Sequence, residues 1–145
     1  MPHITVEIPP ALQDKIDWNN LFKSLHINLA NAGYGRLDDF KSRTINLDCW
    51  QVSDKGEEAV FLFATLQTMN PRPPEMLRAM GGMIYAAIEE QARQIAGDRW
   101  LQVCVKVGGT SPEDYFKGHI NAPDLKAGKF KVGEAEPQRT TTSFE

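Results

Sequence analysis

The sequence predicts a small α+β protein in which a four-stranded sheet is covered on one face by two helices. The length of 145 residues suits one domain. Apolar residues follow the order strand, helix, strand, and this order occurs twice. Shifting the chain on itself by 56 residues places Ile4 on Val60, Leu21 on Leu77 and Arg43 on Arg99. The two halves are therefore predicted to be copies of one βαβ unit.

In the first half, residues 3–8 alternate between apolar and polar side chains until Pro9 and Pro10 interrupt them, which predicts a strand at the start of the chain. Apolar residues at helical spacing predict a helix within 17–32, where Gly33 follows. Alternation returns over 43–52 and predicts the second strand.

In the second half, residues 59–66 are almost continuously apolar, as expected of a central strand. Pro73 and Pro74 begin a helical pattern that ends at Gly97, and we expect Gly81 and Gly82 to weaken this helix while permitting close packing. Residues 99–107 alternate again and predict the fourth strand.

The predicted domain covers residues 1–120, and residues 121–145 are predicted to be a polar C-terminal extension. If both helices take the same face of the sheet, the other face is left uncovered. We expect such a small domain to hide this face by forming an oligomer.

Composition and charge exclude several classes of function. With 16 basic and 19 acidic residues the net charge is −3, so neither nucleic acid nor a membrane surface is an expected partner. No apolar run approaches the ~18 residues of a membrane span, and the N-terminus lacks the features of a signal peptide, which predicts a cytoplasmic protein. Cys49 and Cys104 lie in apolar runs without CxxC spacing and are predicted to be buried free thiols.

Motifs for nucleotide binding, metal binding or serine hydrolysis are absent, so neither a metal site nor a serine-hydrolase site is predicted. The three histidines are scattered along the chain. His26 is predicted to be a surface or edge residue of the first helix, and His3 an ordinary polar residue of the first strand.

Pro2 is the main candidate for catalysis. Excision of Met1 would expose a secondary amine at the start of a strand. Partial burial and neighbouring cations would lower the pKa of this amine toward neutrality, which makes it a candidate general base. The alternative is that Pro2 only begins a strand, where proline is tolerated.

Three cations are candidates for binding an anionic substrate. Lys41 and Arg43 are predicted to share one face of the second strand, and Arg72 precedes the second helix, where backbone amides also favour anions. Each of them also has an ordinary interpretation as a surface charge.

Four stretches resemble the tautomerase superfamily, whose members use an amino-terminal proline, and within it the 5-carboxymethyl-2-hydroxymuconate isomerases. These stretches are MPHITVE at 1–7, KSRTINLDCWQVSD at 41–54, VFLFATLQ at 60–67 followed by Arg72, and YFKGH at 115–119. The resemblance implies a trimeric, cofactor-free isomerase that shifts a proton from the 2-hydroxyl oxygen to C5 of a small carboxylate substrate in homoprotocatechuate breakdown.

Carried onto this chain, the resemblance implies that Pro2 moves the proton and that Lys41, Arg43 and Arg72 bind carboxylates and stabilise the dienolate. The chain departs from the family in having Lys41 where arginine is expected, which weakens bidentate recognition. It also has a proline-rich loop at 69–73. Two alternatives stay open: a tautomerase of another enolisable 2-oxo acid, and a non-catalytic oligomeric binding protein of the same fold.

Overall fold

The computed structural model describes residues 1–121, so the extension predicted at 121–145 lies almost entirely outside the described residues. The chain divides into two compact units. The first consists of Met1–Gln67 with Pro73–Gly108, and the second of Thr68–Arg72 with the chain from Gly109. In the described part of the chain, no helix is both long enough and apolar enough to cross a membrane.

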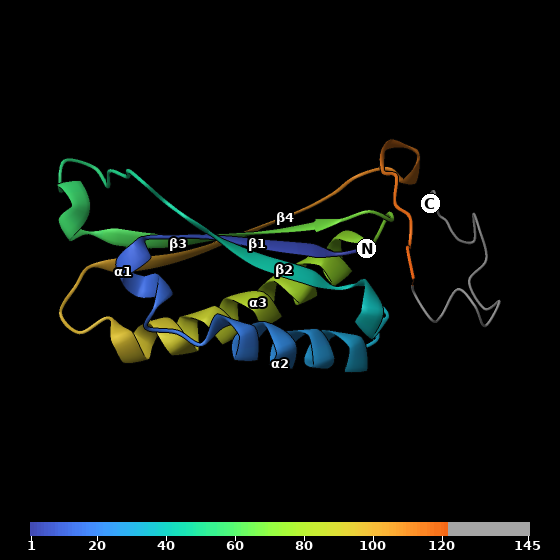
Figure 1. The fold of residues 1–145 in the computed structure, drawn as a ribbon, viewed down its shortest axis with the longest axis horizontal. Helices are drawn as coiled ribbons and strands as arrows, with labels where there is room; N and C mark the ends of the chain where they lie inside the picture. The colour runs from blue at the N-terminus through green and yellow to red at the C-terminus, as the bar shows by residue number, and fades with distance from the viewer. Residues whose placement is uncertain (122–145) are drawn as a thin grey trace. The chain divides into compact units, whose positions relative to one another are not determined.

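The sheet has four strands: β1 (His3–Ile8), β2 (Lys41–Asn46), β3 (Val60–Thr68) and β4 (Leu101–Gly109). Their order in the sheet is β2-β1-β3-β4. The strand β1 pairs with β2 in parallel and with β3 antiparallel, so the two halves of the chain meet in the middle of the sheet. This arrangement confirms the four-stranded sheet predicted from the repeat (Figure 1).

Two long helices, α2 (Trp18–Asn31) and α3 (Pro74–Ile95), lie side by side on one face of the sheet (Figure 1). Helix α2 begins where the Asp17 carboxylate accepts a hydrogen bond from the amide of Asn20, at 3.1 Å. Helix α3 begins with Pro74, which has no amide hydrogen to leave unpaired. The prediction that both helices lie on one face of the sheet is therefore confirmed. The short helix α1 (Pro10–Gln13) is not predicted by the sequence, because four residues are too few to show a helical period and Pro9 and Pro10 indicate only the end of a strand.

The core lies between this face and the helices. In β1, Ile4, Val6 and Ile8 have no exposed surface, and β3 alternates in the same way with buried residues from Val60 to Thr68. Because side chains alternate along a strand, the residues between them occupy the opposite face. There His3, Thr5 and Glu7 of β1 are only half-buried.

Close packing of α3 on β4 depends on Gly81. A β-carbon added at Gly81 would lie 2.7 Å from a methyl carbon of Val107 and 4.0 Å from one of Val105. A β-carbon at the neighbouring Gly82 would have no atom within 4 Å. The predicted close approach is therefore confirmed for Gly81.

The sheet face opposite the helices is called the open face below. Its side chains on the three strands β1, β2 and β3 are half-buried or exposed: His3, Thr5, Glu7, Lys41, Arg43, Ile45, Phe61, Phe63, Thr65 and Gln67. The aromatic and aliphatic members of this set make the open face partly apolar, which fits the prediction of a face that a second subunit covers.

Two predictions about the region around β2 are wrong. The strand ends at Asn46 rather than 52, because its partner β1 ends at Ile8 and Pro9 follows. The Leu47 amide still donates to the Ile8 carbonyl at 2.9 Å, but no partner strand continues beyond it. Cys49 consequently lies after the strand and is exposed, and Cys104 is only half-buried; both are free thiols, as predicted, but neither is buried.

The second unit is described from Thr68 to Arg72 and from Gly109 to Asn121. The Thr68 carbonyl accepts a hydrogen bond from the amide of Thr110 at 2.7 Å, which joins the two segments. A single 3₁₀ turn, η3 (Pro112–Asp114), follows.

Candidate active site

The candidate site is at the start of β1, where the sheet register brings Pro2 to the first residues of β2. The Lys41 amide donates to the Pro2 carbonyl at 3.1 Å, and His3 and Lys41 are paired positions of the parallel ladder. Pro2 is buried. Lys41 and Arg43 lie on the same face of β2, the open face, as the alternation of the sequence predicts. The pairing of β1 with β2 therefore brings Pro2 next to the two cations, Lys41 and Arg43.

Met1 precedes Pro2 in the structure and is 8% exposed. With Met1 in place the Pro2 nitrogen is an amide and has no basicity. Removal of Met1 would convert it to a secondary amine and would also take away the buried side chain next to it. The base predicted at Pro2 therefore requires the excision of Met1.

Lys41 is held by the turn that precedes it. Its Nζ donates to the carbonyls of Asp38 and Asp39, at 3.3 and 3.2 Å, which end the 3₁₀ turn η1 (Leu37–Asp39). Within the described residues, this leaves one of the three ammonium protons for a ligand. Burial of the ammonium lowers the pKa of Lys41, while the carboxylates of Asp39 and Asp38 act to raise it. Lys41 is thus a positioned point charge rather than a bidentate clamp.

Arg43 contacts His3 across the strands. Its Nη1 lies 3.2 Å from Nδ1 of His3, although the ladder pairs Arg43 with Thr5. The contact is therefore diagonal, within the reach of long side chains on neighbouring strands. Burial, followed by the charges of Arg43, Lys41 and the amino terminus, lowers the pKa of His3 from 6.5 to about 4. The ring is consequently neutral near pH 7.

On the other face of β2, Ser42 contacts helix α2. Its Oγ lies 2.6 Å from Nε2 of His26, and the His26 ring stacks on Phe22 and Phe40 at centroid distances of 6.5 and 5.7 Å. Burial and then the charge of Lys41 lower the pKa of His26. His26 is thus half-buried between α2 and the edge strand β2, within the prediction of a surface or edge residue.

Arg72 belongs to the second unit, in the segment Thr68–Arg72, and its side chain is half-buried. The cluster described above is built from the first unit alone. A role for Arg72 beside Pro2 therefore stays a prediction from the resemblance.

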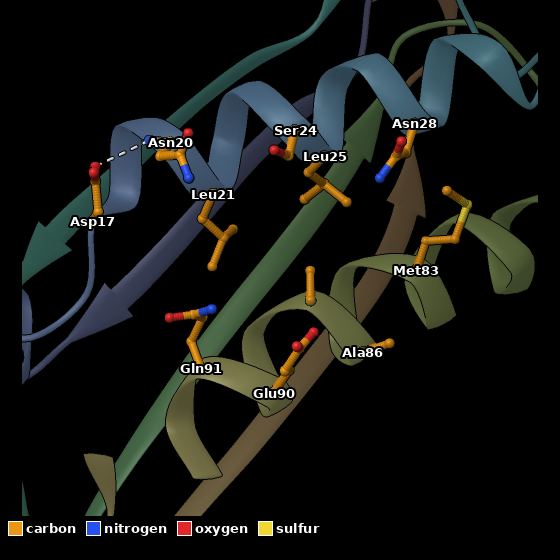
Figure 2. A pocket seen from close by; sticks show the side chains of 11 residues that line it. Asp17, Asn20, Leu21, Ser24, Leu25, Asn28, Met83, Ala86, Glu90 and Gln91 are labelled. Carbon is orange, nitrogen blue, oxygen red and sulfur yellow. Dashed lines mark hydrogen bonds between the residues drawn. The ribbon is translucent and has the colours of Figure 1, made fainter. Parts of the chain in front are cut away.

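A groove of about 440 Å³ lies between α2 and α3, away from the sheet (Figure 2). Its lining includes two carboxylates, Asp17 and Glu90, and no cation. Apolar side chains such as Leu21 and Met83 alternate there with asparagine, serine and glutamine. An anionic substrate is therefore better suited to the start of β1 than to this groove. Among residues 1–121, no three His, Cys, Asp or Glu side chains are grouped to hold a metal ion.

The contact of His3 with Arg43 is not predicted from the sequence, where His3 has the pattern of an ordinary polar residue of a strand. The available signal was its position directly after Pro2, on the same face as the two cations. The sequence contains no signal for the contacts of Lys41 with the Asp38 and Asp39 carbonyls, since every residue has a backbone carbonyl.

The fold is the one shared by proteins of the tautomerase class. A 5-carboxymethyl-2-hydroxymuconate isomerase from Deinococcus radiodurans R1 has a similar structure, with a TM-score of 0.71 and 20% identity over 82% of this chain and 90% of that one. A fused 4-OT described as a symmetric trimer has a TM-score of 0.57 and 17% identity over 88% of this chain and 99% of that one.

The model of the 5-carboxymethyl-2-hydroxymuconate isomerase family matches residues 2–122, so the chain belongs to this family of isomerases. A relative from Escherichia coli, 5-carboxymethyl-2-hydroxymuconate Delta-isomerase, is 26% identical over 117 residues, which cover 81% of this chain and 93% of the relative. The predicted family is therefore confirmed, and the predicted class of enzyme, an isomerase, agrees with it.

Proposed function

We propose that this protein isomerises 5-carboxymethyl-2-hydroxymuconate or a close relative of it, with Pro2 as the general base after Met1 is removed. The observation that carries the proposal is the hydrogen bond from the Lys41 amide to the Pro2 carbonyl, which puts the proline beside the basic start of β2. Family membership supplies the reaction class.

The reaction moves one proton and two double bonds without a net change in composition. The neutral Pro2 amine removes the proton from the 2-hydroxyl oxygen, which leaves a dienolate. The protonated amine then returns a proton to C5, and the 2-oxo-3-ene isomer forms. No redox cofactor is needed, because no electrons enter or leave the substrate, and the three cations take the place that a metal ion could have in stabilising the dienolate.

The cations serve two purposes in this scheme. Lys41, Arg43 and Arg72 hold the carboxylates of the substrate, and they stabilise the negative charge that develops on its oxygen. They also disfavour the ammonium form of the Pro2 amine, which must be neutral to accept a proton. Loss of a group that stabilises a developing oxyanion typically costs about 10²–10³ in rate.

We propose further that the protein is a cytoplasmic homotrimer with one domain at 1–120, and that the open face forms the contact between subunits. Half-buried Phe61 and Phe63 on that face support an interface, because a stable monomer rarely leaves such a patch uncovered. The trimer described for the fused 4-OT is consistent with this number. Light scattering on the purified protein would measure the oligomer directly.

A second candidate is a tautomerase of another enolisable 2-oxo acid. Lys41 favours it, because two of its ammonium protons are occupied by the carbonyls of Asp38 and Asp39. A site with one remaining ammonium proton at this position suits a substrate with fewer carboxylates than 5-carboxymethyl-2-hydroxymuconate, which has three.

The test combines intact mass spectrometry with an ultraviolet assay of 5-carboxymethyl-2-hydroxymuconate on the same sample. We expect loss of Met1 and turnover, and we expect Pro2→Ala to remain folded and to lose most of the turnover. Lys23→Ala, a charge removed from the exposed surface of α2, is the matched control. Near-normal turnover by folded Pro2→Ala would exclude the proline base. Loss of Met1 without turnover would favour the second candidate, and retained Met1 would favour a non-catalytic binding protein.

A further inference from the structure

The contact between His3 and Arg43 fixes where the proton of the imidazole ring sits. A guanidinium group only donates hydrogen bonds, so Nδ1 of His3 must accept at the 3.2 Å contact with Nη1. A neutral imidazole carries one proton, which is therefore on Nε2. A doubly protonated ring could not accept from Arg43 at all.

The surroundings of His3 keep the ring in this neutral form. From β2, Lys41 and Arg43 face it, and before the excision of Met1 the positive amino terminus follows from its own strand. On β3 the paired residue is Gln67, which has no charge. No carboxylate contributes to its titration, and burial and three positive charges together lower the pKa of His3 to about 4. The unprotonated Nδ1 is thus available as a hydrogen-bond acceptor throughout the pH range in which the enzyme would work.

Arg43 needs such a partner because it is exposed. An exposed arginine adopts many rotamers, and holding it in one of them costs conformational entropy when a ligand binds. One N–H on Nη1 directed at His3 orients the planar fork, and four further N–H donors are left in a fixed plane. Orientation before binding lowers the cost of binding.

We propose that His3 is a positioning residue, whose Nδ1 holds the Arg43 guanidinium on the open face so that its fork meets a substrate carboxylate beside the proline. This inference rests on the proposed function. It assigns His3 no contact with the reacting atoms. Its effect is therefore expected on the binding of the carboxylate more than on the chemical step.

The experiment compares three substitutions of His3 in the full-length protein, assayed with 5-carboxymethyl-2-hydroxymuconate. His3→Asn keeps an acceptor oxygen near the place of Nδ1, His3→Gln moves the amide toward the place of Nε2, and His3→Leu has no acceptor. We expect His3→Leu and His3→Gln to raise KM about tenfold, the equivalent of one hydrogen bond to a charged group, with kcat within about threefold. We expect His3→Asn to restore KM.

A double substitution separates positioning from a general structural effect. In an Arg43→Met background, His3→Leu should leave KM unchanged, because the group that His3 orients is gone. A full additional rise in KM in that background would overturn the proposal. An equal loss in His3→Asn and His3→Leu would overturn it as well.

Nitrogen-15 NMR of the histidine rings gives a readout that does not depend on turnover. We expect His3 in the tautomer with the proton on Nε2, and a partial shift toward the other tautomer in Arg43→Met. An active enzyme with the proton on Nδ1 would overturn the pairing and leave the proposed function standing. An inactive enzyme with the proton on Nε2 would overturn the proposed function, and the positioning role with it, while the pairing itself would stand.

Discussion

Nε2 of His26 and Oγ of Ser42 lie 2.6 Å apart, and this contact joins helix α2 to the edge strand β2. Ser42 stands between Lys41 and Arg43, so its side chain points to the face opposite theirs. The short strand that carries both cations is therefore fixed from the helix side, while the cations themselves stay on the open face.

We expect Ser42→Ala to lower the free energy of unfolding by about 1 kcal/mol, because half-buried His26 loses its hydrogen-bond partner. Ser24→Ala, on the exposed side of α2, is the matched control and should change it by less than about 0.5 kcal/mol. Urea denaturation at neutral pH measures both. Equal midpoints for the two variants would show that the contact adds no net stability.

The sequence predicts the strands and the two long helices because both of its periodicities are strong: the alternation of the strands and the helical spacing of apolar residues. The alternation at 3–8 gave β1 without error, and Gly81 pointed to the close approach of α3. The end of β2 could not be predicted in the same way, because residues 47–52 continue the alternation. A strand also needs a partner, and β1 had already ended at Ile8.

The candidate site was predictable only in part. A period of two is enough to place Lys41 and Arg43 on one face. The contact of Arg43 with His3 depends on the register between β1 and β2, which no local pattern determines. The two carbonyls that hold Lys41 depend on the path of the chain through η1, which is set by tertiary packing.

Stability should depend on pH through the two histidines whose pKa values are lowered. The pKa of His3 is lowered to about 4, and the pKa of His26 is lowered as well, so below about pH 6.5 the unfolded chain binds more protons than the folded one. The free energy of unfolding should therefore fall as the pH falls through this window, and for His3 the loss ends near pH 4. Urea midpoints at several pH values would measure it.

The double variant His3→Asn, His26→Asn is the control for this effect. Its urea midpoint should change less between about pH 7 and pH 5 than that of the unsubstituted protein, because neither position then titrates. Parallel profiles for the two proteins would contradict the assignment to these rings.

The two neighbouring glycines of α3 should respond in opposite directions to alanine. Gly81→Ala places a methyl group 2.7 Å from the stiff, β-branched Val107 and should destabilise the protein by about 1–3 kcal/mol. Gly82→Ala meets no atom within 4 Å and should stabilise it by about 0.5–1 kcal/mol, since alanine favours the helix. Thermal unfolding of both variants measures the difference. A Gly81→Ala protein as stable as Gly82→Ala would show that α3 can move away from β4.

Lys41 should act in the proposed reaction through its charge more than through its shape. Lys41→Met is expected to lower kcat/KM by about 10²-fold, because a cation beside the developing oxyanion is lost. Lys41→Arg should keep the activity and lower KM for 5-carboxymethyl-2-hydroxymuconate, since a guanidinium can bind a carboxylate with two hydrogen bonds. Lys23→Met, on the exposed surface of α2, is the control for net charge. Equal activity of Lys41→Met and Lys23→Met would exclude Lys41 from the site.

Arg72 is restrained by its neighbours in the sequence. The loop has prolines at 71 and 73, and a residue that precedes proline is confined to extended backbone conformations. A proline-rich loop thus limits the directions available to the half-buried Arg72 side chain before any substrate binds.

We expect Arg72→Gln to lower kcat/KM by about 10²–10³-fold without loss of the folded state, because the proposed role of Arg72 is to stabilise the dienolate. Arg78→Gln, exposed on α3, removes the same charge and should have little effect. Kinetics of both variants, with circular dichroism to verify folding, test the role of Arg72. An activity of Arg72→Gln within about threefold of that of Arg78→Gln would remove Arg72 from the mechanism. Lys41 and Arg43 would then be the anion-binding groups.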